Sequence, residues 1–460
     1  MTRIALQRTR TVSTAAAGAL ALPGLAAAAS GSAAAPAGPE VFGVPVDFVL
    51  FGLVLIGVAL FHHRTLQVAA SGLAVISLYK VMFTGFAQGP GVAGLAAHVL
   101  HEWVGVVNLF CLLVGFALLA DHFERSEVPQ ALPRFLPDDW KGAFALLAMV
   151  WVLSAFLDNI AAALIGGAMA HTVFRKKVHI GYLAAIVACA NAGGAGSVVG
   201  DTTTTMMWIQ GVSPLSVIHA FVAAAVALVV CGIPASLQQH KHSPILRDEV
   251  KGTHIDWGRV LVVGVILAAA VSVNVFVNMN LGEGAEKFPF IGVAVWVALL
   301  AMVPVRKPSW ELLPGAVKGS IFLLCLVLSA TMMPVERLPS ASWQTALGLG
   351  FLSSIFDNIP LTALALKQGG YDWGVLAYAV GYGGSMVWFG SSAGVAISNM
   401  YPEAKSVGAW VRSGWHVAVA YVAGFFVLLA LLGWHPTPKR GAAAVHGELA
   451  PATAVVAPAG

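Results

Sequence analysis

Charged residues are scarce in this chain of 460 residues, because Asp, Glu, Lys and Arg together make up only 10% of it. Soluble domains carry about 25% charged residues, so this composition excludes a soluble globular protein. Apolar residues make up 58% of the sequence, in continuous runs too long for the alternating strands of a β-barrel. The fold class that remains is an all-α polytopic membrane protein, with the lipid bilayer as its first expected partner.

Sequence motifs of enzymes and of nucleic-acid binding are also missing. The sequence has no HExxH, P-loop or GxSxG pattern and no basic patch with interleaved aromatic residues. We therefore predict no enzyme activity, no cofactor and no nucleic-acid partner. Without a nucleotide site, primary pumping by this chain alone is not expected either. The four cysteines lie in apolar runs without CxxC spacing, which indicates small buried apolar residues: Cys111, Cys189, Cys231 and Cys325.

The chain does contain one polar motif that occurs twice. Residues 153–160 read LSAFLDNI and residues 352–359 read LSSIFDNI, each inside a long apolar stretch. A carboxylate at bilayer depth costs roughly 2.5 kcal/mol or more, so an Asp there normally has a function. A single intramembrane Asp can be the structural partner of a buried Lys or His. Two at equivalent positions of a repeat, Asp158 and Asp357, favour an ion site instead.

Continuous apolar runs predict eight unbroken membrane helices. These cover residues 44–61, 66–86, 103–119, 214–235, 257–277, 288–305, 313–334 and 409–432. The stretch 142–174 is too long for one span and has basic residues at both ends, and cytoplasmic loops favour Lys and Arg. It predicts a re-entrant hairpin with its Asp-Asn pair at the tip. Residues 341–366 predict a second hairpin that enters from the other side.

Two further helices are predicted to be broken in the middle. Residues 179–210 and 373–400 are interrupted by glycine-rich and polar segments at 191–205 and 381–394, which cannot remain regular lipid-facing helix. The total is about ten transmembrane helices, two of them broken, plus two re-entrant hairpins. The two halves have opposite orientation, which is the inverted-topology repeat of secondary transporters.

The predicted organisation runs from a signal peptide to a disordered tail. Residues 1–30 combine Arg3, Arg8 and Arg10 with a short Ala/Leu-rich core, which is typical of a secretory signal; an uncleaved tail is the alternative. The remaining parts are N-terminal helices (44–121), a first hairpin and broken-helix repeat (142–235), linking and scaffold helices (257–334), a second hairpin and broken-helix repeat (341–433) and a disordered tail (434–460).

Polar residues at the hairpin tips and helix breaks form the candidate cation- and proton-binding site. Carboxylates supply charge, while amide, hydroxyl and unwound backbone oxygens can complete the coordination of a hard cation. Close helix packing would explain the glycines but not the polar runs beside them. The candidates are Asp158, Asn159, Asn191, Ser197, Asp201, Thr202, Thr203, Asp357, Asn358, Ser385, Ser391 and Ser392. Asp158, Asp201 and Asp357 are the expected carboxylate ligands of a transported Na⁺.

The charge of these candidates indicates the class of substrate. An anion would be repelled by three carboxylates at low dielectric, whereas Na⁺ or Li⁺ fits them and H⁺ can compete for the same oxygens. Other polar residues have structural interpretations. Lys80 is expected to snorkel or to balance a carboxylate. His98, His101 and Glu102 are expected in an interfacial turn before the helix at 103–119, and an entry or pH-sensing cluster is the alternative.

The segments SAFLDN (154–159), NAGG (191–194) and GDTTT (200–204) resemble bacterial NhaD-type sodium/proton antiporters of the ion transporter superfamily. The resemblance covers about residues 45–433. It implies paired hairpins, a midplane site, exchange of Na⁺ or Li⁺ for H⁺, a homodimer with elevator-like motion and a multi-pass location in the bacterial inner (cytoplasmic) membrane.

The resemblance also assigns residues to two half-sites. Asp158, Asn159, Asn191 and Asp201 would form the first, and Asp357, Asn358, Ser391 and Ser392 the second. The sequence departs from the family pattern at Gly196, where a bulkier residue is expected, and at residues 396–403. Two alternatives stay open: a Na⁺-coupled importer of an organic or inorganic anion, and a channel or membrane subunit of a complex.

Overall fold

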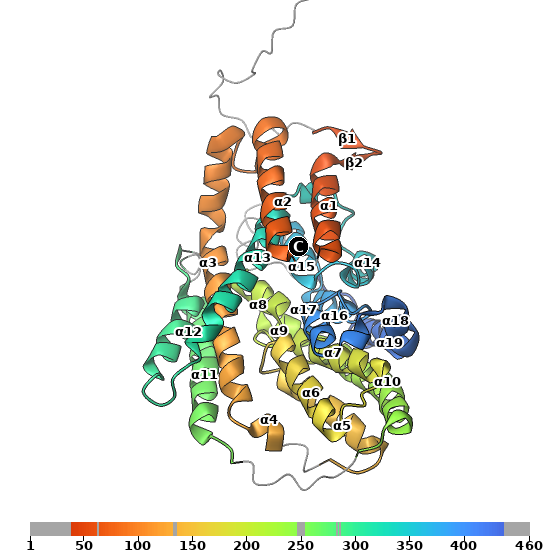
Figure 1. Ribbon diagram of the computed structural model, residues 1–460. Helices are drawn as coiled ribbons and strands as arrows, with labels where there is room; N and C mark the ends of the chain where they lie inside the picture. Colours follow the sequence, from red (N-terminus) through yellow and green to blue (C-terminus); the bar gives the residue numbers. More distant parts are fainter. Residues whose placement is uncertain are drawn as a thin grey trace, which may run out of the picture. The chain divides into compact units, whose positions relative to one another are not determined.

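Helices make up most of the computed structural model, which describes residues 38–61, 64–131, 136–245, 254–281, 284 and 287–436 (Figure 1). The strands of this part are β1 (Glu40–Val41) and β2 (Val44–Pro45), which pair antiparallel before the first helix. Six helices of the described residues are long and apolar enough to span a membrane. The predicted all-α polytopic fold class is therefore confirmed. The predicted signal peptide and residues 437–460 of the predicted tail lie outside the described residues.

A first group of helices comes from the N-terminus and from the middle of the chain. It contains α1 (Val46–Leu60), α2 (Thr65–Tyr79) with the π-helical turn η2 (Lys80–Thr84), α3 (Gly91–Glu124), α11 (Trp257–Asn280), α12 (Phe290–Ala301) and α13 (Leu313–Thr331). α2 and α3 pack on α13, and α11 and α12 pack on α3. Short elements connect this group: α4 (Val128–Ala131), η5 (Trp310–Leu312) and η6 (Val335–Arg337).

A second group contains the hairpins and the broken helices. In the first half these are α5 (Trp140–Ser154), α6 (Asn159–Val173), α7 (Ile180–Ala195) and α8 (Thr202–Ile209), followed by α9 (Pro214–Val217) and α10 (Ala220–His242). In the second half they are α14 (Trp343–Ser353), α15 (Asn358–Gln368), α16 (Trp373–Gly383) and α17 (Ser392–Met400), followed by η7 (Pro402–Lys405), α18 (Val407–Ser413) and α19 (Trp415–Leu432).

The core of the second group is formed by α7 and α16, which pack on each other. Every residue from Gly181 to Ala195 and every residue of α16 is buried. Both helices are rich in Gly and Ala, which lets neighbouring backbones approach closely. α5 packs on α7 as α14 packs on α16, and α10 and α19 close the bundle. The two groups meet where α15 contacts α13 and α8 contacts α3.

Three predicted boundaries are wrong. The helix expected at 103–119 is the 34-residue α3, because the short polar insertions before it fall within one helix. The breaks are shorter than expected: residues 191–195 stay helical in α7, and α8 already starts at Thr202. The last helix is divided at Gly414 into α18 and α19.

The longer α3 also changes the interpretation of the residues expected in an interfacial turn. His98, His101 and Glu102 lie inside α3, and His98 is only 3% exposed. The His98 ring nitrogens lie 3.2 Å from Gln88 Oε1 and 3.2 Å from Thr331 Oγ1. His98 therefore ties α3 to the end of α13.

Lys80 balances the charge of a carboxylate, which is one of the two roles expected for it. Its Nζ donates to Asp47 Oδ1 at 3.1 Å, and Thr84 Oγ1 donates to the same oxygen at 3.3 Å. Both charged side chains are almost completely buried. Asp47 was not predicted from the sequence as the partner of Lys80.

Candidate functional site

Both hairpins turn at their Asp-Asn motif, where the Asp caps the second arm. α5 ends at Ser154 and α6 starts at Asn159, and Asp158 Oδ1 accepts the backbone N–H of Ile160 at 2.9 Å. In the second hairpin Asp357 Oδ1 accepts the N–H of Ile359 at 3.0 Å. Asp satisfies an unpaired helix N-terminus well, and its negative charge complements the helix dipole. One oxygen of each carboxylate is thus held by the fold.

The other carboxylate oxygen faces the broken helix of the same half. Thr202 Oγ1 donates to Asp158 Oδ2 at 3.4 Å, and Ser392 Oγ donates to Asp357 Oδ2 at 3.0 Å. The breaks themselves end in capping residues. Asp201 Oδ1 accepts the N–H of Thr203 at 3.0 Å, and Ser391 Oγ accepts the N–H of Gly394 at 3.2 Å. The arrangement at the two tips is the same, with Thr in one half and Ser in the other.

The glycines allow the hairpins and the broken helices to touch. A Cβ on Gly193 would overlap the carbonyl oxygen of Trp151, and a Cβ on Gly383 would overlap that of Gly350. Each carbonyl belongs to the first arm of the neighbouring hairpin. Gly196, where the family resemblance led us to expect a bulkier residue, faces the ring of Phe221, which a larger side chain would overlap.

A chain of hydrogen bonds joins the two half-sites. Asn159 Nδ2 donates to Asn191 Oδ1 at 2.9 Å, and Asn191 Nδ2 donates to Ser385 Oγ at 2.9 Å and Ser391 Oγ at 3.2 Å. Asn191 is fully buried. The second arms also cross between halves, since α6 packs on α17 and α15 packs on α8. The structure thus brings the candidates of the two halves together.

Some buried polar atoms at the site have no hydrogen-bond partner among the described residues. These are Asp201 Oδ2, Thr203 Oγ1 and Asn358 Nδ2. Buried polar groups are normally paired, and unpaired ones point to a missing ligand, ion or water. Asp201 is 1% exposed, and its Oδ2 is therefore a buried carboxylate oxygen that a cation could bind.

A cavity of about 330 Å³ lies against this site. The predicted site residues that line it are Asp158, Asn159, Asp201, Thr202, Asn358 and Ser392. Asn191, Ser385 and Ser391 lie behind that layer in the hydrogen-bond chain. Ser197 does not line the cavity, and its Oγ accepts the N–H of Val199. Across the described residues no three His, Cys, Asp or Glu side chains form a metal-binding cluster. A bound cation would therefore need hydroxyl, amide or backbone oxygens besides carboxylates.

Comparison with known proteins reveals relatives, although no family model matches the chain. The chain is 27% identical to sodium/proton antiporter 1 of Arabidopsis thaliana over 326 residues, which cover 62% of this chain and 53% of that protein. It is 28% identical to sodium/proton antiporter 2 of the same plant, over 64% of this chain and 75% of the relative. The Na⁺/H⁺ antiporter NhaD of Vibrio parahaemolyticus is 27% identical, over 54% of this chain and 71% of the relative.

The chain is a relative of the NhaD-type sodium/proton antiporters. The resemblance inferred from the motifs is thereby confirmed. The matched region spans about half the length of the first of these relatives, which is 53% covered.

The cavity also contains two acidic residues that were not predicted from the sequence. Asp121 and Glu124 line the same cavity as Asp158 and Asp201. The predicted helix ended at residue 119 and thus left both in a loop. Their spacing from Leu113, Phe116, Ala117 and Ala120 would have revealed them as part of one helix face.

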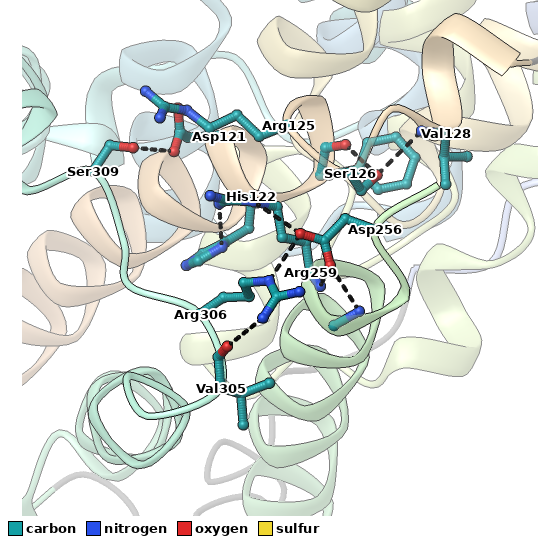
Figure 2. A network of polar contacts seen from close by, with 12 residues as sticks. Asp121, His122, Arg125, Ser126, Val128, Asp256, Arg259, Val305, Arg306 and Ser309 are labelled. Atoms are coloured by element: carbon teal, nitrogen blue, oxygen red, sulfur yellow. Dashed lines mark hydrogen bonds and ion pairs between the residues drawn. The ribbon is translucent and has the colours of Figure 1, made fainter. Parts of the chain in front are cut away.

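A polar network surrounds this end of α3 (Figure 2). Asp121 accepts hydrogen bonds from Arg125 Nε at 2.8 Å and from Ser309 Oγ at 2.6 Å. Asp256, the N-cap of α11, accepts a hydrogen bond from Arg306 Nε at 2.8 Å. This hydrogen bond lowers the pKa of the Asp256 carboxyl below its ordinary value. The network ties α3, α11 and the segment before α13 together beside the cavity.

Proposed function

We propose that this chain exchanges Na⁺ or Li⁺ for H⁺ across a membrane. The observation that carries the proposal is the charge of the cavity: among its described lining residues are four acidic side chains, Asp121, Glu124, Asp158 and Asp201, and no Lys, Arg or His. Such a lining attracts a cation and repels an anion. The relatives named as sodium/proton antiporters support the same activity, and none supports the anion-importer alternative.

The exchange follows from how the two oxygens of each tip carboxylate are used. Oδ1 of Asp158 and of Asp357 stays on the helix N-terminus. Oδ2 can hold either a proton or the cation, with the hydroxyl of Thr202 or Ser392 beside it. Arrival of Na⁺ at a protonated carboxyl releases one H⁺, and a returning H⁺ releases the Na⁺. The helix caps persist through both steps, so the site can change its ligand without unwinding.

The finer predictions from the sequence belong to this proposal. The candidate residues of both halves are proposed to form one cation and proton site, within an inverted repeat of two hairpin and broken-helix units. The matching contacts at Asp158 and Asp357 support that repeat. The ten-span topology, the domain boundaries, the homodimer and the inner-membrane location are proposed on the resemblance to NhaD-type proteins.

The test is ion exchange in everted vesicles. We expect addition of Na⁺ to collapse an imposed ΔpH, and Asp158→Asn to abolish that collapse. The matched control is Asp372→Asn, because Asp372 also caps a helix, accepting the N–H groups of Gly374 and Val375, but does not line the cavity. No response to Na⁺ or Li⁺ in the unmodified protein would refute the function. Normal exchange by Asp158→Asn would refute the assignment of the site.

A further inference from the structure

A second cavity, of about 220 Å³, lies along the same helix as the first. The α3 residues that line the two cavities follow one another in steps of one or three residues. They run from His101 to Leu109 along the second cavity and from Leu109 to Glu124 along the first. This spacing places all of them on one face of α3. From His101 to Glu124 the helix rises about 35 Å, enough to cross a hydrocarbon core of about 30 Å.

Three other helices continue from the first cavity to the second in the same way. On α13, Leu323 lines the first cavity and Val327 the second, one helical turn apart. α8 lines the first cavity with Thr202 and Thr205 and the second with the following turn, and α15 behaves likewise. The two cavities are therefore the two ends of one passage between α3, α8, α13 and α15.

The passage is closed at the level of Leu109, the residue that lines both cavities. Leu109 is 3% exposed, and the neighbouring Met206 and Val327 are also buried. The ends are polar by contrast, with His101 and Glu102 at one mouth and Glu124 at the other. Apolar constrictions between polar mouths block ions by excluding water.

We propose that Leu109 is the apolar barrier between two access cavities, and that it keeps protons from bypassing the carboxylate site. In this conformation the first cavity contains the Asp158 and Asp201 side chains and extends to Glu124 at the end of α3. The barrier deepens the proposed exchange, because coupling of Na⁺ to H⁺ requires that no proton crosses without meeting a carboxylate. It lies on α3, which belongs to the first group of helices, whereas Asp158, Asp201 and Asp357 belong to the second.

The first experiment measures proton leak in proteoliposomes with an imposed pH gradient and no Na⁺. Leu109→Ser is expected to dissipate the gradient several-fold faster than the unmodified protein, because a small polar side chain lets water join the cavities. Leu100→Ser is the matched control, since Leu100 lies on α3 but is 71% exposed and lines neither cavity. If a folded Leu109→Ser variant leaks protons no faster than the control, the proposed barrier is refuted.

Repeating the leak measurement in the Asp158→Asn background separates the barrier from the proposed function. Leak that persists there arises from the passage and not from exchange. Normal Na⁺ exchange by Asp158→Asn alone would refute the site and leave the barrier intact.

A second experiment does not depend on the fold of a Leu109 variant. In a background without the four native cysteines, single cysteines replace Val106 in the second cavity and Leu113 in the first. A membrane-impermeant thiol reagent is added to vesicles of either orientation. Val106→Cys and Leu113→Cys are expected to react from opposite faces of the membrane. Reaction of both from the same face would show that Leu109 separates nothing.

Discussion

Replacing Asn191 by Ala tests the link between the two halves of the site. The substitution removes the hydrogen bond from Asn159 and those to Ser385 and Ser391. A net contribution of about 0.5–1.5 kcal/mol for each of the three bonds gives a total of about 1.5–4.5 kcal/mol. The Asn159 amide, which lines the cavity, is then left without its partner.

Part of this free energy is expected to appear in cation binding, because Asn159 directly follows the tip carboxylate. If the cation-bound state loses about 1.4 kcal/mol, which is the contribution of one such hydrogen bond, the Na⁺ concentration for half-maximal exchange rises about tenfold. The rest should appear as a lower melting temperature in detergent. The assay is Na⁺-dependent ΔpH collapse in proteoliposomes, titrated with Na⁺, together with thermal melting of the purified protein.

Asn108→Ala is the matched control for Asn191→Ala. Asn108 is also a buried Asn, and its Oδ1 accepts the backbone N–H of Gly292 at 2.8 Å between α3 and α12, away from the carboxylates. We expect it to lower the melting temperature while leaving the Na⁺ titration unchanged. If Asn191→Ala behaves in both assays like the unmodified protein, the hydrogen-bond chain does not couple the half-sites and the reasoning fails.

Three further predictions concern the frame around the site. Asp47→Asn should destabilise the protein by about 3–5 kcal/mol, because it leaves buried Lys80 without its counter-ion. A double variant with apolar residues at both positions should have a melting temperature closer to that of the unmodified protein. Equal melting temperatures of the single variant, the double variant and the unmodified protein would contradict the pairing. Asp256→Asn should lower the melting temperature at pH 7, since the Arg306 hydrogen bond depresses the pKa of this carboxyl. That contribution is present above the ordinary carboxyl pKa of about 4 and disappears as the pH falls through the lowered value, so the difference should vanish in acid, and a constant difference would refute it. Gly383→Ala should prevent α16 from packing on α14, because its Cβ would overlap a backbone carbonyl; full expression and exchange by this variant would count against that contact.

The sequence predicted the elements of this protein better than their ends. Continuous apolar runs and glycine-rich breaks are strong signals, so helices end and restart close to the Asp-Asn motifs and the glycine-rich segments, as expected. The end of α3 was missed because charged residues normally indicate a loop. Asp121 lies inside α3, however, and pairs with the C-cap residue Arg125 one turn later. Pairing of this kind depends on helix geometry, which a hydropathy pattern does not contain.

The residues of the candidate site were also predicted only in part. The motif identified the Asp-Asn tips, because a carboxylate in an apolar run is conspicuous in the sequence. It could not indicate that Asn191 reaches Ser385 and Ser391, residues 194 and 200 positions later in the chain. Nor could it reveal the Asp47–Lys80 pair or the passage along α3, because these arise from packing between segments that are distant in sequence.

The capping role of the carboxylates affects how tightly the site can bind a cation. α6, α8 and α15 each begin at an Asp whose side chain accepts a backbone N–H. A helix N-terminus carries roughly half a positive elementary charge, so each carboxylate is partly neutralised before any cation arrives. The site therefore attracts a cation less strongly than three carboxylates that cap no helix would. In the proposed antiporter this weaker attraction would help the cation to leave in every cycle, because a more tightly bound ion would be released more slowly.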